Sequence, residues 1–221
     1  MDLLEAMEQR HSVRQYRNEP LSKEARAALE AEIDRCNRES GLHIQLVTDE
    51  PKAFDGFMAH YGKFSGVTNY IAMIGKKGAK LDEACGYYGE RLVLLAQQLG
   101  LNTCWVAMTY QKVPSAFRLD AGEKLAIVIA IGYGKTQGTA HASKAPERVS
   151  NAGGQAPVWF ANGVRAALLA PTAMNQQKFR LGLDGSTVTA KAGVGFYSKI
   201  DLGIVKYHFE IGAGKENFTW R

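Results

Sequence analysis

The chain has 221 residues, of which 46% are hydrophobic and 22% are charged, and its formal net charge is +5. This composition is typical of a globular protein with one large domain or two small ones. No run approaches the roughly 18 apolar residues that a membrane-spanning helix needs, and the first ten residues carry acids where a signal peptide carries bases. We therefore expect a cytoplasmic protein without a membrane partner.

The positive charge is concentrated in the last third of the chain. Residues 1–150 carry 19 basic and 18 acidic side chains, whereas residues 151–221 carry 8 and 4. This excess favours an anionic ligand, but the interleaved aromatic and basic residues of nucleic-acid-binding proteins do not accompany it. We therefore expect a small-molecule partner and no nucleic acid.

The predicted elements begin with a short amphipathic helix in the stretch MDLLEAMEQR. In residues 21–41, Ser22 can cap the start of a second helix and Gly41 can end it. Alternating apolar residues then predict strands in residues 42–49 and 69–78, with a short helix or loop between them.

The middle of the chain predicts a long buried helix and a central strand. Residues 82–100 carry an apolar face, and Gly100 suits the position just after a helix. An apolar segment follows and ends near Met108. The stretch KLAIVIAIGYG, residues 124–134, is an almost unbroken apolar run rich in β-branched residues. Such a run indicates burial on both faces and a central place in a sheet.

A polar connector in residues 135–155 precedes the last third. Residues 157–171 then predict a helix with a proline near its first turn. Residues 175–193 alternate around an Asp-Gly turn, which predicts a β-hairpin. A last helix is predicted from residue 201 to 212, followed by a terminal strand or tail. The absence of a regular βαβ order favours an α+β fold.

Two segments of the chain share one pattern. Residues 89–100 and 203–214, GERLVLLAQQLG and GIVKYHFEIGAG, each run eleven residues from one glycine to another. Either two amphipathic helices resemble each other by coincidence, or the chain holds two degenerate copies of one unit. On the second interpretation, the first half comprises residues 1–150 and the shorter second half residues 151–221.

Cysteine and histidine spacing indicates no metal site. Cys36, Cys85 and Cys104 form no CxxC pair, which favours small buried residues in a reducing compartment over disulfides or zinc ligands. The five histidines form no HxH or HExxH pattern. We expect no metal, and we assign no catalytic side chain because no nucleophile stands with a matching base.

The stretch RHSVRQY, residues 10–16, places Arg10, Ser12 and Arg14 at alternate positions. In an extended segment these side chains point to the same side. Guanidinium groups bind phosphate oxygens bidentately and keep their charge, so the three side chains suit a phosphate group. The alternative is a solvated basic edge.

This stretch resembles the phosphate-binding signature of the FMN-dependent nitroreductase family, Arg-x-Ser-x-Arg or Lys after a first helix. APTAMNQQKF, residues 170–179, resembles the family's second signature, a Pro-Ser-Ser-x-Asn-x-Gln-Pro-Trp type of segment. GLNTCWVAM, IAIGYGK and ASKAPERV resemble further family segments, so the resemblance extends from residue 1 to about residue 213. It implies a nitroreductase-like α+β fold.

The order of the two signatures is unusual. Ordinary family members are homodimers with flavins at the interface, and their second signature lies near the start of the chain. Here it lies in the second half. The sequence is therefore similar to a divergent branch in which two degenerate halves of one chain mimic the family dimer. This implies one composite flavin site per chain, in a monomer or a weak homo-oligomer.

The resemblance implies an FMN-dependent oxidoreductase that uses NADH or NADPH. A nitroaromatic, quinone or similar electron-poor acceptor would take the electrons in a ping-pong cycle of hydride transfer. The residues expected at the phosphate are Arg10, Ser12 and Arg14, with His11 as a neighbour and Lys144 as a further cation. Those expected beside the flavin ring and ribityl chain are Pro171, Thr172, Asn175 and Gln177, together with the backbone N–H groups of Ala107, Met108 and Thr109.

Departures from the family pattern leave alternatives open. Lys178 replaces the usual proline of the second signature, and the pair Ala107-Met108 replaces a more polar pair. Taken alone, Asn175 and Gln177 are typical of turns, and Lys144 is typical of a surface. The chain could therefore be a non-catalytic flavin- or anionic-ligand-binding protein of the same fold, or a nucleotide-binding module that uses only the arginine segment.

Overall fold

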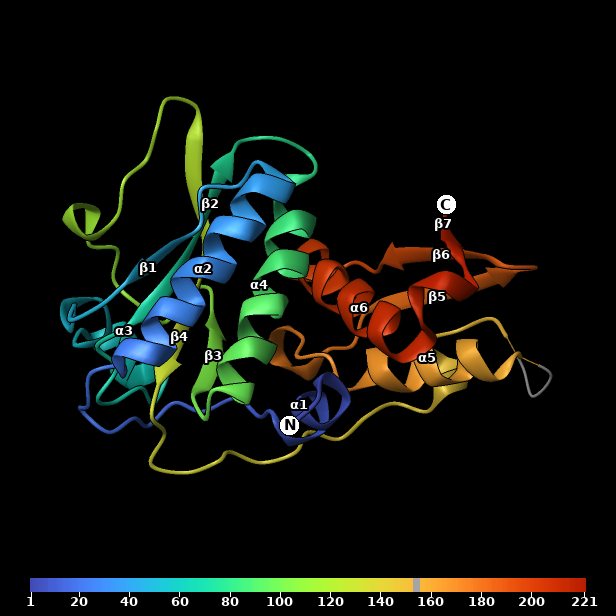
Figure 1. The fold of residues 1–221 in the computed structure, drawn as a ribbon, viewed down its shortest axis with the longest axis horizontal. Coiled ribbons are helices and arrows are strands. Elements are labelled where there is room, and N and C mark those ends of the chain that lie inside the picture. Colours follow the sequence, from blue (N-terminus) through green and yellow to red (C-terminus); the bar gives the residue numbers. More distant parts are fainter. Residues whose placement is uncertain (153–155) are drawn as a thin grey trace. The chain divides into compact units, whose positions relative to one another are not determined.

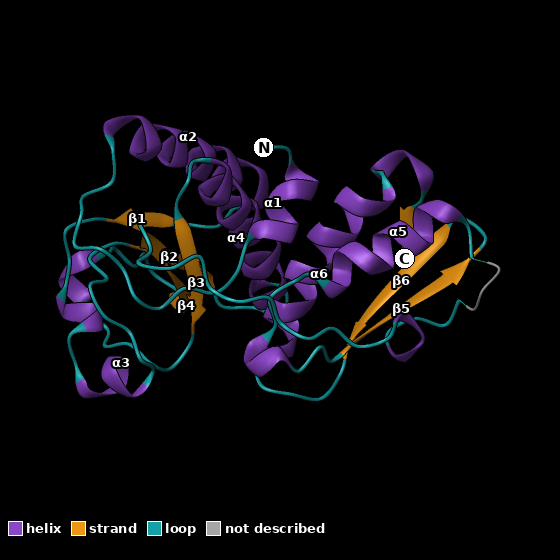
Figure 2. Ribbon diagram, turned by 90° about the horizontal axis from the view of Figure 1, so that it is seen from below, coloured by secondary structure: helices purple, strands orange, loops and turns teal. Residues whose placement is uncertain are grey.

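The computed structural model describes residues 1–152 and 156–221, and within them the chain forms two compact units. The four-stranded unit comprises residues 10–81 and 92–140, and the hairpin unit comprises residues 1–9, 82–91 and 141–221. Helices and strands are mixed in both units (Figures 1 and 2), in agreement with the predicted α+β class.

Neither unit is contiguous in sequence. Helix α4, Leu81–Gln98, contributes its first half to the hairpin unit and its second half to the four-stranded unit. The chain also changes unit after residue 140, inside the predicted polar connector, whose residues 153–155 lie outside the described residues. The division into degenerate halves at residue 150 concerns a repeat rather than these units, and it stays a prediction.

The four-stranded unit is built on an antiparallel sheet with the order β1-β2-β4-β3. Strand β4 lies between two others, and its register pairs Ile129 with Ile71 on one side and Ala130 with Cys104 on the other. The central position that its apolar run predicts is therefore confirmed. The strand bounds are Gln45–Val47 for β1, Tyr70–Lys76 for β2, Asn102–Val106 for β3 and Glu123–Gly132 for β4.

Helix α2, Lys23–Ser40, covers one face of this sheet beside the second half of α4 (Figures 1 and 2). It begins and ends where predicted, because Ser22 Oγ accepts a hydrogen bond from the backbone N–H of Ala25 and Gly41 takes a φ of 70°. The opposite face packs on Phe54, Phe64 and Tyr16. Phe54 ends the short helix η1, Lys52–Phe54, which is followed by α3, Phe57–Tyr61; η2, Pro114–Ala116, precedes β4.

The hairpin unit contains the predicted β-hairpin. Strands β5, Phe179–Asp184, and β6, Thr187–Ala192, pair antiparallel, and Gly185 takes a φ of 59° in the turn between them. The C-terminal strand β7, Thr219–Trp220, pairs parallel with β6. The helices of this unit are α1, Leu3–Gln9; α5, Val158–Leu168; and α6, Ser198–Ala213; with short 3-10 turns at Pro146–Arg148, Ala173–Asn175 and Lys215–Asn217.

Close helix packing holds the hairpin unit together. Helix α6 crosses the first half of α4 at Gly203 and Gly86, where an added Cβ on either glycine would collide with a backbone carbonyl of the other helix. His208 on α6 is fully buried and lies 2.9 Å from Glu90 Oε1 of α4 and 3.1 Å from the carbonyl oxygen of Ala166 on α5. One histidine therefore joins three helices.

Two expectations from composition can be compared with the structure. All three cysteines are buried, as predicted. Among the described residues, none of the helices combines the length and apolar character needed to cross a membrane.

Candidate functional site

Residues 10–16, here called the arginine segment, lie extended beside strand β3 in the four-stranded unit. Ser12 bridges Thr103 in parallel, and the N–H of Val13 donates to the carbonyl of Thr103 at 3.0 Å. Further along, the N–H of Ser65 donates to the carbonyl of Arg14 at 3.0 Å. These main-chain bonds fix the extended backbone, so successive side chains point to opposite sides.

Three side chains of the arginine segment act on the thiol of Cys104, Ser12 through a hydrogen bond and the two arginines through their charge. Burial raises the pKa of this thiol, and the charge of Arg14, a hydrogen bond from Ser12 and the charge of Arg10 act in the opposite direction. Val13, between them, is buried in the core. The extended backbone of residues 10–14 therefore directs two guanidinium groups and a hydroxyl to one side, next to β3.

The exposure of these side chains differs along the segment. Arg10 is 3% exposed, Ser12 and His11 are half-buried, and Arg14 is exposed with its guanidinium carbon 5.9 Å from the centroid of the Phe64 ring. His11 packs near Gly138, where an added Cβ would lie 2.8 Å from the Cβ of the histidine. The segment therefore runs from a buried arginine to an accessible one.

Ala107, Met108 and Thr109 directly follow β3, the strand that holds Ser12. Ala107 and Thr109 are half-buried, and the Met108 side chain is 66% exposed. These three residues therefore belong to the same unit as the arginine segment, at the end of the strand beside which it runs.

Residues 171–177 of the hairpin unit, here called the Asn/Gln loop, follow α5 and have an unusual backbone. Met174, Asn175 and Gln177 take φ values of 51°, 52° and 43°. A residue other than glycine in this left-handed region costs on the order of 1–3 kcal/mol, and such residues cluster at functional sites. The surrounding contacts must hold the loop in this conformation.

A network of side-chain hydrogen bonds supplies part of that support. Gln177 is 3% exposed, and its amide nitrogen donates to Asn175 Oδ1 at 2.6 Å and to the carbonyl of Ala142 at 2.8 Å. Its amide oxygen accepts from the N–H of Lys144 at 2.8 Å, and its own N–H donates to Thr172 Oγ1 at 3.0 Å. Asn175 is exposed, but its Nδ2 donates to the carbonyl of Ala142 at 2.8 Å, so the protein engages both amides.

Lys144 belongs to the same cluster. Its Nζ donates to the carbonyl oxygens of Gln176 and Gln177 at 2.7 and 3.0 Å. The predicted site residues thus fall into two groups: Arg10, His11, Ser12, Arg14, Ala107, Met108 and Thr109 lie in the four-stranded unit, and Lys144, Pro171, Thr172, Asn175 and Gln177 lie in the hairpin unit.

Asp201 of α6 also contacts the Asn/Gln loop, and no sequence pattern indicated it. It is 4% exposed, its Oδ1 accepts from the N–H of Ala173 at 3.0 Å, and its Oδ2 accepts from Gln176 Nε2 at 2.7 Å. Burial raises the pKa of this carboxyl to about 6, although both hydrogen bonds act to lower it. The sequence marks Asp201 only as a residue near the start of a helix.

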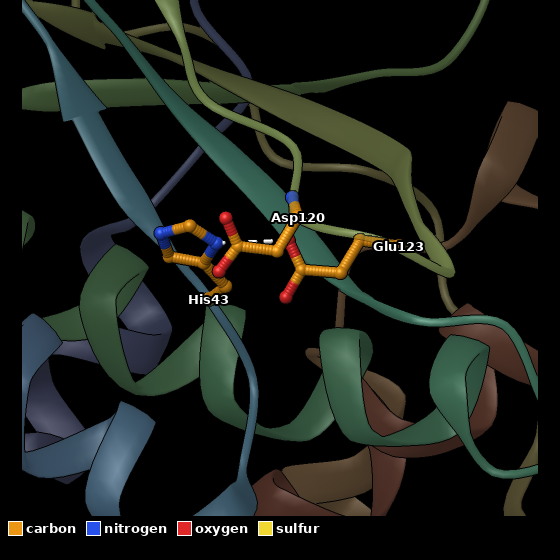
Figure 3. Close-up of side chains that lie close together, drawn as sticks. All are labelled: His43, Asp120 and Glu123. Carbon is orange, nitrogen blue, oxygen red and sulfur yellow. Dashed lines mark hydrogen bonds and ion pairs between the residues drawn. The ribbon is translucent and has the colours of Figure 1, made fainter.

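A third cluster, His43, Asp120 and Glu123, has ligand atoms within 4.8 Å of one another (Figure 3). His43 Nδ1 lies 2.9 Å from Glu123 Oε2, and Arg118 Nε lies 2.8 Å from Asp120 Oδ1. Burial acts to raise the pKa of Glu123, but hydrogen bonds from His43 and the N–H of Asp120 outweigh it, so the pKa is lowered. Each carboxylate thus has a basic partner, and we interpret the cluster as a clamp on the turn before β4.

The family model described as "Putative TM nitroreductase" matches residues 2–213. Solved structures share the fold. A putative nitroreductase from Thermotoga maritima is 22% identical, with 98% of this chain and 85% of that chain covered and a TM-score of 0.68. A putative NADH dehydrogenase/NAD(P)H nitroreductase from Parabacteroides distasonis is 24% identical, with 68% and 98% covered and a TM-score of 0.53.

A putative nitroreductase from Desulfovibrio desulfuricans, solved in complex with FMN, is 20% identical, with 67% of this chain and 95% of that chain covered and a TM-score of 0.51. A comparison with curated proteins gave no match. The shared fold agrees with the predicted nitroreductase-like class. Since the family model covers nearly the whole sequence, the chain belongs to the family described as "Putative TM nitroreductase".

Proposed function

We propose that the chain is an FMN-dependent oxidoreductase that uses NADH or NADPH to reduce nitroaromatic, quinone or similar electron-poor acceptors. The observation that carries this proposal is the extended course of residues 10–14 beside β3, which directs the side chains of Arg10, Ser12 and Arg14 to one side. Membership of the nitroreductase family supports it, as does the FMN bound to a structural relative.

The donor set of the arginine segment fits the phosphate of FMN. A phosphate presents only acceptor oxygens and negative charge, whereas two guanidinium groups and one hydroxyl present donors and positive charge. Each charge-assisted hydrogen bond contributes about 1.5–3 kcal/mol. The extended backbone is already held by β3 and Ser65, so binding requires little ordering of the main chain.

The Asn/Gln loop supplies a second set of groups. Asn175 is exposed, and beside its bonds to Gln177 and the carbonyl of Ala142 its amide keeps one N–H and one oxygen lone pair, which suit the mixed polar edge of the flavin. Gln177, Thr172 and Lys144 hold the loop through the hydrogen bonds described above. We assign these three a supporting role and Asn175 a ligand-contacting one. The backbone N–H groups of residues 107–109 are a further proposed contact to the flavin ring.

When bound, FMN supplies reversible two-electron chemistry, and the protein supplies binding, orientation and electrostatics. The positive charges of Arg10 and Arg14 hold the anionic end of the cofactor. No side chain is required as a nucleophile. We also propose that the protein acts in the cytoplasm as a monomer or weak homo-oligomer.

An anaerobic spectral experiment tests the proposed function. The protein reconstituted with FMN should be yellow, lose its colour with NADH or NADPH, and regain it with a quinone. A protein that takes up FMN but is not reduced would support the alternative of a non-catalytic flavin-binding protein, which the exposed apolar Met108 favours. A protein that takes up no FMN would contradict both.

The number of flavins per chain is a separate test. The resemblance to a family dimer mimicked by one chain implies one FMN per chain. A titration that saturates at one FMN agrees with this interpretation, and saturation at two would contradict it.

A further inference from the structure

Building on the proposed function, we propose that Asp201 is a positioning residue whose ionised carboxylate holds the Asn/Gln loop in its left-handed conformation for flavin binding. Its two oxygens accept from the loop at two separate points, the N–H of Ala173 at 3.0 Å and Nε2 of Gln176 at 2.7 Å. The carboxylate is 4% exposed, so water competes little for these bonds.

The two bonds bracket the strained residues. Met174 and Asn175, with φ values of 51° and 52°, lie between Ala173 and Gln176. Strained backbone persists only where neighbouring contacts over-determine it. Asp201 therefore ties the residues on both sides of Met174 and Asn175 to helix α6.

Gln176 links the carboxylate to a second segment. Its Nε2 also donates to the carbonyl of Phe196 at 2.7 Å, just before Tyr197, which takes a φ of 57° at the start of α6. Loss of the carboxylate acceptor would therefore loosen the loop and the turn that leads into α6.

The groups that act on the carboxylate from the loop are neutral donors, Ala173 and Gln176. The cation bound to the loop, Lys144, contacts carbonyl oxygens instead. On α4, which packs against α6, Glu83 is paired with Lys206. Since burial raises the pKa of Asp201 to about 6, protonation below that pH is expected to place a hydroxyl opposite one of the two donors.

The direction of the pKa shift of Asp201 separates a role in holding the loop from a role in the stability of the fold alone. A carboxyl whose pKa is higher in the folded than in the unfolded protein favours the folded state when it is protonated. Acidification from pH 7.5 to 5.5 therefore stabilises the fold through Asp201 while it weakens the loop. FMN affinity and thermal stability should respond in opposite directions.

The variant Asp201→Asn tests this proposal. It keeps an oxygen for Ala173 but directs an amide nitrogen at the Gln176 donor. We expect FMN affinity at pH 7.5 to fall about tenfold, as for one lost charge-assisted hydrogen bond, and to depend less on pH than in the wild type. The control Asp184→Asn makes the same chemical change at an exposed turn of the hairpin. It should leave FMN affinity and the pH dependence of that affinity unchanged.

Hydrogen exchange of residues 170–178, measured in the full chain without added FMN and at one pH, provides a readout independent of flavin. Faster exchange in Asp201→Asn but not in Asp184→Asn supports the inference even if the chain proves not to bind FMN, which would overturn only the proposed function. Unchanged exchange would overturn the inference.

A second variant covers the case in which Asp201→Asn does not fold. Gln176→Met removes the amide donor while it leaves the carboxylate in place. It should raise the exchange rate of the same residues and move the loss of FMN affinity to a higher pH, because one of the bonds that favour the charged carboxylate is gone. An unmoved pH profile together with unchanged exchange would contradict the role of Asp201.

Discussion

The arginine segment and the Asn/Gln loop use backbone and side chains in opposite ways. In the arginine segment, a regular extended backbone is held by main-chain bonds to Thr103 and Ser65, and the side chains gather beside it. In the Asn/Gln loop, the backbone is strained and the side chains of Thr172 and Gln177 hold it. Substitutions in the first region should therefore affect ligand binding with little effect on conformation, whereas substitutions in the second should act through conformation.

The largest expected effect is on the arginine segment. Replacing Arg10 and Ser12 together by alanine removes at least two donors, so FMN affinity should fall roughly 10²–10⁴-fold. Equilibrium dialysis measures this, and thermal unfolding shows whether the buried Arg10 is also needed for stability. The exposed Arg17, whose guanidinium lies over the Tyr133 ring, provides the control Arg17→Ala, which should bind FMN normally. Unchanged FMN affinity in the double variant would contradict the view that the arginine segment acts mainly in ligand binding.

The next largest effect concerns the fold of the hairpin unit. Glu90→Leu removes the partner of the fully buried His208 Nε2, and a buried polar group left without its partner costs about 1–3 kcal/mol of unfolding free energy, more when it is charged. Chemical denaturation measures this loss. FMN affinity per folded molecule should stay near the wild-type value, since neither residue contacts the Asn/Gln loop in the hydrogen bonds described. If the free energy of FMN binding fell by as much as the free energy of unfolding, the Asn/Gln loop would be coupled to the packing of the helices that His208 joins.

A smaller effect is expected inside the Asn/Gln loop. Thr172→Val keeps the shape of the side chain but leaves the N–H of Gln177 without its acceptor, at a cost of about 1–3 kcal/mol. Hydrogen exchange of residues 170–178 should increase, and FMN affinity should fall about tenfold. The four-stranded unit should show wild-type exchange, because the change lies outside it. If affinity falls without any change in exchange, Thr172 contacts the ligand itself.

The smallest effect concerns the clamp of His43, Asp120 and Glu123. Because the pKa of Glu123 is lowered in the folded protein, its contribution to stability is present above the ordinary pKa of a glutamate and is lost as the pH falls through the lowered value. Glu123→Gln should therefore remove less than about 1 kcal/mol, as for a pair near the surface, and flatten the acid limb of the stability curve. Urea unfolding between pH 3 and 6 measures this, and an unaltered limb would contradict the assignment.

Local signals in the sequence predicted much of the fold. Ser22 and Gly41 mark the ends of α2, the apolar run of residues 124–134 marks a central strand, and Asp184-Gly185 marks the hairpin turn. Each of these features depends on residues that are neighbours in sequence, so a local sequence pattern is sufficient to predict it. The helix predicted from residue 201 in fact begins at Ser198. The residue before it, Tyr197, takes a φ of 57°, and tyrosine is not a residue whose presence predicts a left-handed conformation.

The site was harder to predict because its contacts join distant residues. The alternation of Arg10, Ser12 and Arg14 indicated a common side, but the strand beside which they lie, β3, is about ninety residues away. Asp201 contacts Gln176 across 25 positions, and no spacing rule links them. No local pattern predicts the left-handed Met174, since methionine carries no preference for that conformation.

The most direct test of the central claim compares FMN with riboflavin, which lacks the phosphate. The wild-type chain should bind FMN at least about a hundredfold more tightly, as expected for several charge-assisted hydrogen bonds to one phosphate, and this ratio should collapse in the Arg10→Ala/Ser12→Ala variant. Equal affinity for the two flavins in the wild type would contradict the assignment of the arginine segment as the phosphate site.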